Sequence, residues 1–481
     1  MVDFETRTAQ LDDLLGVGRN FDMVSRSLQV GGRKARPFSQ RRHIIKKRKA
    51  RLWVVNGYAE DMLIERMIGR LLAIGDLKKV PDLASFLAAY VTVPDAAAET
   101  DVHSMVVGVF AGKTLLVMDG YDGGVLMDAK EYPTRSVEEP DTSKVLRGSH
   151  DGFVESIMAN AALLRRRIRD PALTLERHQV GGRSQTDVAL VYMKGEANEQ
   201  HLRQLRQKLD SIDVRSITMS QESIAECIVP KQWWNPFPKI RYTERPDVAT
   251  ASVMEGSILL MIDNTPSVML LPTTLFSFAE EINDYYFPPL IGTYLRIVRL
   301  VVLFLTVFIT PLWYLLVKNG DVLPGELEFL LIEDEYFVPL IVQLLLVEFI
   351  VDILKLASLN TPDALSNSFS MLGALILGDF AVQARWLVPE VLVYMAFVAV
   401  AGYAQHSYEM GYACKLVRMI LLVLIWLWDG WGFAAGVVGT VVLIASTKPV
   451  VGKGYLYPLI PFNGKRLMRI LRRRPIDKDN T

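Results

Sequence analysis

The pattern of hydrophobic and polar positions divides the chain near Tyr294, because charged residues are frequent before this point and sparse after it. The run from Leu300 to Val317 contains no charge and is long enough to cross a bilayer as a helix. Further apolar stretches follow it. The pattern predicts about six transmembrane helices, at 297–317, 337–356, 366–383, 387–404, 412–428 and 431–448. Four spans are the alternative, if one polar pair is re-entrant.

The polar first part of the chain mixes short apolar runs with amphipathic stretches, which predicts α/β structure. Strands are expected at 102–109, 114–118, 187–192, 257–262 and 267–271, and helices at 60–74, 151–169 and 199–212. The predicted fold class is an α+β and α-helical membrane protein. Its expected parts are an irregular basic arm (1–50), two cytoplasmic α/β subdomains (51–150 and 151–295), a transmembrane domain (296–450) and a basic cytoplasmic tail (451–481).

Charges in the loops predict the orientation of the spans. The loop after Val317 is acidic, which suits the outside, whereas Lys415 and Arg418 lead into the fifth span and the tail from Lys465 is basic, which suits the cytoplasm. The N-terminus, Met1 to Gln10, lacks the apolar core of a signal peptide. Both termini are therefore expected in the cytoplasm, and six spans satisfy every loop.

Composition and motifs argue against several classes of function. The formal net charge is zero, and the basic run Lys46 to Lys49 has no aromatic interleaving, so it indicates an arm near anionic headgroups or simply a solvated arm, and no nucleic-acid partner. Gly108 to Thr114 is one residue short of a phosphate-binding loop and leads into a strand. Without a nucleophile–base pair or a metal cluster, we expect no enzyme, no cofactor and no metal.

Charges inside the second predicted span are its most unusual feature. Glu348, Asp352 and Lys355 share one face of a helix because they lie at i, i+4 and i+7. Asp352 and Lys355 can pair, which leaves Glu348 near the middle of the membrane. Burying an ion there costs on the order of 3 kcal/mol, so Glu348 is expected to face protein or water. A polar contact between helices and a role in conduction are both open.

The third predicted span carries small and hydroxylated residues on one face. A stripe of this kind that ends in leucine suits a water-filled path with an apolar constriction, if the protein is a ring-shaped oligomer. The same small residues also allow close helix packing, which is the better interpretation for a monomer. The candidate pore-lining residues are Ser366, Asn367, Ser370, Gly373 and Leu377.

Several separated segments resemble the A subunits of GerA-type spore germination proteins. The most specific is Asn235 to Asp247, with the sequence NPFPKIRYTERPD. Other matching segments are 137–141, 147–148, 151–155, 164–169, 186–189 and 263–268. Residues 388–390, 407–410 and 455–465 resemble one subgroup of that family.

The resemblance implies a multi-pass protein of the spore inner membrane that acts in germination. Family members are expected to form homo-oligomeric, pentameric channels that release monovalent cations. The subgroup is expected to amplify the germination signal, with partners in the SpoVA proteins that release calcium dipicolinate and in a small membrane protein of the FigP type. A transport accessory and a non-conducting scaffold for SpoVA-type proteins are the alternatives.

Overall fold

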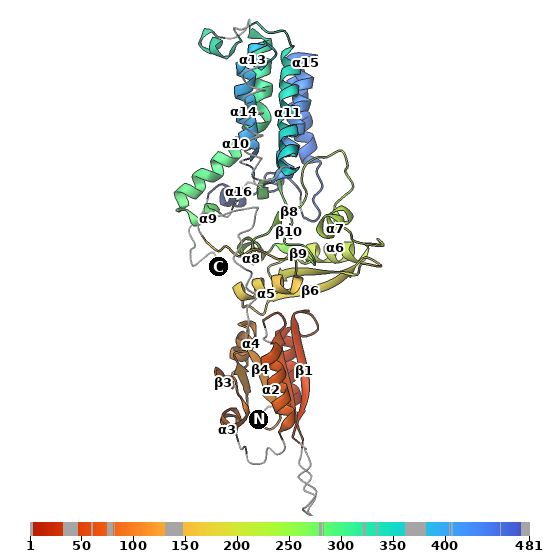
Figure 1. Ribbon diagram of the computed structural model, residues 1–481, viewed down its shortest axis with the longest axis vertical. Coiled ribbons are helices and arrows are strands. Elements are labelled where there is room, and N and C mark those ends of the chain that lie inside the picture. The colour runs from red at the N-terminus through yellow and green to blue at the C-terminus, as the bar shows by residue number, and fades with distance from the viewer. Residues whose placement is uncertain are drawn as a thin grey trace, which may run out of the picture. The chain divides into compact units, whose positions relative to one another are not determined.

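The computed structural model describes residues 3–31, 47–58, 61–74, 80, 82–129, 148–278, 281, 283–320, 324–332, 335–360, 381–403, 405, 407–452 and 454–472. Its internal contacts divide the chain into two units. The first unit comprises residues 1–229 and 242–272, and the second comprises residues 230–241 and 273–481. The first unit contains two β-sheets, and the second contains the long helices (Figure 1).

The first sheet has the strand order β1-β2-β4-β5-β3, and its neighbouring strands are antiparallel. Its strands are β1 (Met23–Val30), β2 (Arg48–Val55), β3 (Ala96–Glu99), β4 (Thr114–Met118) and β5 (Gly124–Met127). Four helices belong to the same part of the chain: α1 (Phe4–Leu15), α2 (Asp61–Ala73), α3 (Leu83–Tyr90) and α4 (Val102–Phe110).

Alternation along the strands explains why helices cover both faces of this sheet. Trp53 and Val55 of β2 lie in one hydrophobic cluster with residues of α1 and α4. Leu52 and Val54, which alternate with them along β2, lie in another cluster with residues of α2 and α3. Successive side chains of a strand point to opposite faces, so a strand that is apolar throughout is buried on both sides.

Two expectations for this region are wrong. Residues 4–30 are not an irregular arm, because α1 and β1 belong to the first sheet's subdomain. Residues 102–110 form helix α4, not a strand. Asp101 caps this helix by accepting a hydrogen bond from the backbone N–H of Ser104 at 2.8 Å. The apolar run after it is compatible with either structure, and the cap favours the helix. The basic run Lys46 to Lys49 enters β2 at Arg48.

The second sheet has the order β6-β7-β9-β10-β8. Its strands are β6 (Leu173–Val180), β7 (Thr186–Met193), β8 (Arg241–Thr243), β9 (Ile258–Ile262) and β10 (Val268–Leu271). The accompanying helices are α5 (Ile157–Arg167), α6 (Glu199–Asp210), α7 (Ser220–Ile228) and α8 (Pro246–Met254). The predicted strands at 187–192, 257–262 and 267–271 and the predicted helix at 199–212 are confirmed. The mixed α/β character of the first part is therefore correct.

A buried ion pair joins the two subdomains of the first unit. Arg165 of α5 and Asp22, just before β1, both have fully buried side chains. Arg165 donates from Nε to Asp22 at 2.9 Å and from Nη1 to the carbonyl of Leu173 at 2.8 Å. Its guanidinium also lies 4.7 Å from the ring centre of Phe110. These contacts satisfy a charge that would otherwise be costly to bury.

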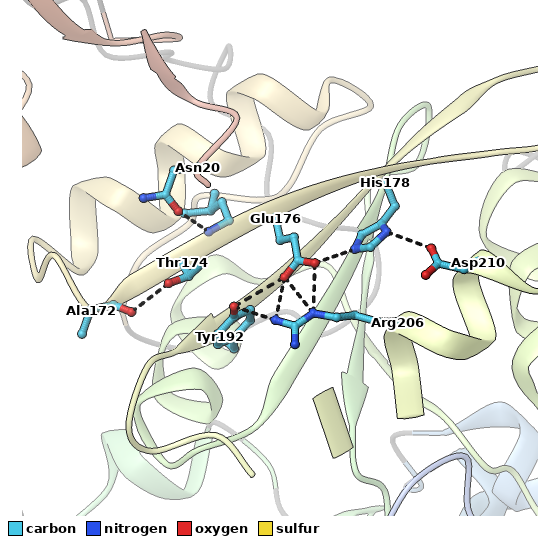
Figure 2. Close-up of polar contacts among 9 residues, drawn as sticks. Asn20, Ala172, Thr174, Glu176, His178, Tyr192, Arg206 and Asp210 are labelled. Carbon is cyan, nitrogen blue, oxygen red and sulfur yellow. Dashed lines mark hydrogen bonds and ion pairs between the residues drawn. The ribbon is translucent and has the colours of Figure 1, made fainter. Parts of the chain in front are cut away.

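A second polar cluster connects the edge strand β6 of the second sheet to helix α6 (Figure 2). Glu176 of β6 accepts three hydrogen bonds from Nε and Nη2 of Arg206 in α6, at 2.8 to 3.1 Å, and lies 3.1 Å from His178 Nε2. The His178 hydrogen bond, followed by Arg206, lowers the pKa of Glu176 to about 2. The same hydrogen bond raises the pKa of His178 above its ordinary value, and Asp210 adds to the effect. The cluster therefore carries two carboxylates and two cations at mildly acidic pH.

The regular elements described in the second unit are mainly helices. The longer ones are α10 (Pro289–Lys318), α11 (Leu340–Asn360), α14 (Pro389–Tyr403) and α15 (Tyr408–Ala445). The shorter elements are α9 (Asn283–Tyr286), α13 (Ala381–Gln383), α16 (Gly464–Leu471) and the 3-10 turns η1 (Leu275–Phe278) and η3 (Gly325–Leu330).

The described residues contain two helices that are long and apolar enough to cross a membrane, not the six expected. They are Pro289–Lys318 and Tyr408–Ser446. Three of the predicted spans are not found among these two helices, each for a different reason. Helix α11 carries Glu348, Asp352 and Lys355, helix α14 has 15 residues, and most of the predicted span at 366–383 lies outside the described residues.

Helix α15 contains the boundary between the fifth and sixth predicted spans. Trp428 and Asp429 leave helical geometry, with Asp429 at φ 50°. After this break the backbone at Gly432 packs against the carbonyl of Leu424 so closely that a Cβ would not fit. A Cβ at Gly436 would likewise collide with the side chain of Leu421. Such contacts require two helices that fold back on one another, because residues this far apart in a straight helix do not meet.

We predict that Asp22→Asn destabilises the first unit by about 3–5 kcal/mol, because it leaves Arg165 buried without its counter-charge. The free energy can be measured by chemical unfolding of the full chain followed by pulse proteolysis. Asp13→Asn is the matched control, since its pair with Arg19 is exposed and should contribute less than about 1 kcal/mol. Equal effects of the two variants would show that the buried pair does not hold the subdomains together.

We also predict that the contribution of His178 to stability depends on pH. A raised pKa means that folding favours the protonated ring, so this contribution is complete below about pH 6.5 and is lost as the pH rises through the folded-state pKa. Conversely, the contribution of Glu176 is complete above about pH 4.5 and is lost as the pH falls toward 2. The unfolding midpoint of His178→Gln should therefore approach that of the unaltered protein between pH 6 and pH 8.5.

The difference at pH 6 is expected to be below about 1 kcal/mol, because the cluster is partly solvated. His103→Gln replaces an exposed histidine on α4 and serves as the control. A deficit of His178→Gln that is the same at both pH values would contradict the role assigned to the protonated ring.

Candidate functional site

The candidate site is a cluster of charged side chains between the apolar helices of the second unit. Glu348 of α11 is 2 % exposed. It lies one turn before Asp352, in a stretch whose other residues from Leu340 to Ile353 are uncharged. A carboxylate in such a place needs partners within the protein.

Two cations of α15 supply those partners. Arg418 donates from Nε to Glu348 Oε1 at 2.7 Å, and a second guanidinium nitrogen contacts the same oxygen. Lys415 Nζ donates to the backbone carbonyl of Glu348 at 2.9 Å and lies 3.3 Å from Oε2. Arg418 also donates from Nη1 to the carbonyl of Thr306 in α10, at 2.6 Å. The cluster therefore connects α10, α11 and α15.

The spacing within α11 allows Asp352 to pair with Lys355, but the ion pair that Asp352 makes is with another helix. Asp352 Oδ2 lies 2.5 Å from Lys415 Nζ, so both acids of α11 share the same lysine of α15. Lys355 Nζ instead lies 5.4 Å from the ring centre of Tyr412, as in a cation–π contact. Asp352 pairs with a residue of another helix because α15 packs against this face of α11 and brings two cations to it.

A cavity of about 40 Å³ adjoins the cluster. Its lining includes Thr306, Glu348, Lys355, Tyr408, Lys415 and Arg418, and further residues come from α14. A volume of this size holds roughly two or three water molecules, and polar walls are the kind that retain water. Within the apolar helices this cavity offers ions and water a polar environment.

The charges in and beside this cavity come from five side chains. Lys355, Lys415 and Arg418 are cations, and Glu348 and Asp352 are acids, so the ordinary ionised forms leave an excess of one positive charge. Asp352 Oδ1 is buried and has no hydrogen-bond partner among the described residues. It can accept a bond from water or from a cation. The site thus offers polar groups to water or an ion, beside apolar lining residues such as Val351 and Met395.

The predicted pore-lining residues Ser366, Asn367, Ser370, Gly373 and Leu377 lie outside the described residues. Their assignment stays a prediction. They follow α11 in the sequence, and α11 is the helix that carries Glu348.

Lys415 and Arg418 are the site residues that sequence reasoning missed. It treated them as markers of a cytoplasmic loop, whereas both are buried in α15 and pair with α11. A signal was present: the two cations lie three residues apart and therefore on one face of an otherwise apolar helix. Glu348 and Asp352 form the complementary pair on α11, so matching the two faces would have found the contact.

Polar residues of the segment from Asn235 to Asp247 have structural partners. Asn235 Nδ2 donates to Thr447 Oγ1 at 2.7 Å, just beyond the end of α15. Lys239 donates to the carbonyl of Pro230 at 3.1 Å. In the first unit, Arg245 is fully buried and is bound by Asp247 and by the carbonyl of Ser149. This segment thus fixes local structure in each unit.

Comparison with known proteins agrees with these motifs. The family model described as "Bacillus/Clostridium GerA spore germination protein" matches residues 10–481. Stage V sporulation protein AF of Bacillus subtilis (strain 168) is 35% identical over 458 residues, covering 95% of this chain and 90% of that protein. The uncharacterized membrane protein YfkQ of the same strain is 26% identical over 389 residues, covering 80% and 75%.

A solved structure also matches. It is the crystal structure of the N-terminal domain of the A subunit of the Bacillus megaterium spore germinant receptor GerK3, with 24% identity and a TM-score of 0.40 over 56% of this chain and 94% of that one. The family match covers nearly all of the sequence, and the relative at 35% identity is matched over nearly its whole length. The chain therefore belongs to the GerA family of spore germination proteins.

Proposed function

We propose that this protein is a membrane subunit of a spore germination complex and conducts monovalent cations as a homo-oligomer. Its family supports the role in germination. Two long apolar helices and the similarity to a membrane protein support a location in the membrane, which for a germination protein is the spore inner membrane. A pentamer is the assembly that the family resemblance implies.

The observation that carries the conducting role is the cavity between α10, α11, α14 and α15, and because its cations exceed its acids by one we propose it as a polar gap between helices and not as a cation-binding site. Ionisable residues among apolar helices are costly to bury. Where they occur, they mark an ion path or pair with one another between helices. Here they adjoin a cavity large enough for water. Helix α11 leads directly into the stripe of small and hydroxylated residues at 366–377, which we propose as the pore-lining segment.

The polar contacts at the helix ends support the proposed orientation. At one end of the bundle, Lys318 pairs with Asp429 at 2.6 Å, beside the break in α15. The two halves of α15 fold back at this break, so the C-terminal end of α15 lies at the other end of the bundle. There, Gln232 and Asn235 bind the backbone of Ser446 and the side chain of Thr447. This arrangement suits an outer face at Lys318 and Asp429 and a cytoplasmic face at Thr447, and an even number of crossings would then place both termini in the cytoplasm.

The proposal extends to partners and chemistry. In the proposed complex the protein amplifies the germination signal and works with the SpoVA system for dipicolinate release and a small FigP-type membrane protein. We propose no enzymatic role. Among the described residues, no three His, Cys, Asp or Glu side chains are grouped to hold a metal ion.

A non-conducting scaffold or transport accessory is the second candidate. It is favoured by one observation: Glu348 already makes charged contacts with Arg418 and Lys415, so its carboxylate is occupied in holding helices together. A scaffold would assemble with SpoVA-type proteins and leave ion flux unchanged.

Ion flux through reconstituted protein separates the two candidates. The full chain in liposomes, alone and with its small partner, is expected to release trapped potassium when a gradient is applied. The oligomeric state is measured in the same preparation. A correctly assembled oligomer that passes no monovalent cation would favour the scaffold.

We predict that Ser370→Leu lowers potassium flux at least tenfold without changing oligomer size, because it would place an apolar side chain in the proposed water-filled path. Leu377→Ser should raise flux by widening and wetting the proposed constriction. Val393→Leu, at an exposed position of α14, is the control and should leave flux unchanged. Normal conductance in both pore variants would mean that the ion path is lined by another helix.

A further inference from the structure

The short helix α16 near the end of the described chain separates apolar and basic residues onto two faces. Leu467, Ile470 and Leu471 lie at i, i+3 and i+4, which places them on one side. Lys465 lies on the opposite side, Arg466 lies at the edge of the apolar side, and both are exposed. A helix of this kind suits the boundary between an apolar layer and anionic headgroups.

Contacts with α10 fix the level at which α16 lies. Arg296 of α10 donates from Nη1 to the carbonyl of Ile470 at 3.0 Å. Arg296 lies four residues before Leu300, where the charge-free run begins, which is about 6 Å along the helix. Helix α16 is therefore held beside the end of the apolar part of α10, the level expected for the headgroups.

The segment that leads into α16 is anchored in the same unit. Tyr455 is buried in a cluster that includes Val307 of α10 and Leu421 of α15. Its carbonyl accepts a hydrogen bond from the backbone N–H of Leu275 at 2.9 Å. Asn463 then caps α16 by accepting from the N–H of Arg466 at 3.1 Å. The position of α16 is thus set from both ends.

Large apolar side chains around α16 remain exposed. Phe462 is 74 %, Ile460 is 64 % and Met468 is 52 % exposed. They adjoin the exposed basic side chains of Lys465, Arg466 and Arg472. A surface that is both apolar and basic matches the boundary of a bilayer, where acyl chains meet phosphate groups.

The charge of this surface is not balanced within the tail. The sequence contains no Asp or Glu between Asp429 and Asp477. The nearby arginines of α10 are different, because Arg296 and Arg299 both pair with Asp284 at 3.1 Å. The excess positive charge of the tail is therefore available to an external anionic partner.

We propose that residues 459–472 form a binding surface for anionic phospholipid, with the apolar residues entering the bilayer boundary and Lys465 and Arg466 contacting lipid phosphates. This proposal rests on the membrane location in the proposed function, but it does not depend on conduction. Binding would fix the cytoplasmic end of α10, because α16 is bonded to Arg296.

Hydrogen–deuterium exchange of the full chain in nanodiscs tests this surface. One set of discs contains phosphatidylcholine only, and the other contains phosphatidylcholine with phosphatidylglycerol. Peptides from 459–472 are expected to exchange roughly tenfold more slowly in the anionic discs, and the difference should shrink at high salt. Lys465→Gln combined with Arg466→Gln should remove most of this protection.

The matched control is Lys194→Gln combined with Arg203→Gln, which removes two exposed cations from the first unit. It should leave protection of 459–472 unchanged. Equal exchange in the two kinds of disc would overturn the proposal, as would protection that depends on protein concentration and not on lipid charge, because a second copy would then cover the surface. Peptides from 300–317 report separately whether the protein is inserted, so loss of the membrane location itself would be recognised.

Discussion

The arrangement of the second unit depends on the ion pairs between Glu348 and the cations Lys415 and Arg418. Placing these charges among apolar helices is costly, and each charge left alone would cost several kcal/mol. They are tolerated because each acid oxygen and each cation has a partner on another helix, apart from Asp352 Oδ1. Packing between apolar side chains depends only weakly on the orientation of the helices. The ion pairs are directional, so they also specify how the helices face one another.

The same contacts connect the membrane unit to its proposed activity. Arg418 bridges Glu348 to the carbonyl of Thr306, so a movement of α11 relative to α10 or α15 would break charged hydrogen bonds. The cavity beside them is lined by the same residues. A change in these ion pairs would therefore alter both the helix arrangement and the environment of the proposed path. In the proposed function, these ion pairs are the physical element of this chain on which a germination signal would act.

The sequence carries much of the fold but less of the site. Short apolar runs bounded by turn residues correctly placed β7, β9 and β10, the 3.6-residue period correctly placed α6, and a charge-free run correctly placed α10. Helix α4 was missed because a short apolar run fits either structure until its Asp101 cap is considered. The partner of Asp352 was missed because spacing within one helix favours Lys355, whereas the choice depends on which helix packs against it. The sequence of α11 alone does not indicate that tertiary contact, which is found only by matching the charged face of α11 with that of α15.

A double-mutant cycle of Glu348 and Arg418 in the full chain tests the central claim most directly. Glu348→Gln and Arg418→Gln are each expected to lower the free energy of unfolding by about 3–5 kcal/mol, because each leaves a buried charge without its main partner. The double variant should be less destabilised than the sum of the single variants, by at least about 2 kcal/mol. Additive losses would contradict the account, since they would mean that the two side chains do not stabilise the helices through one another.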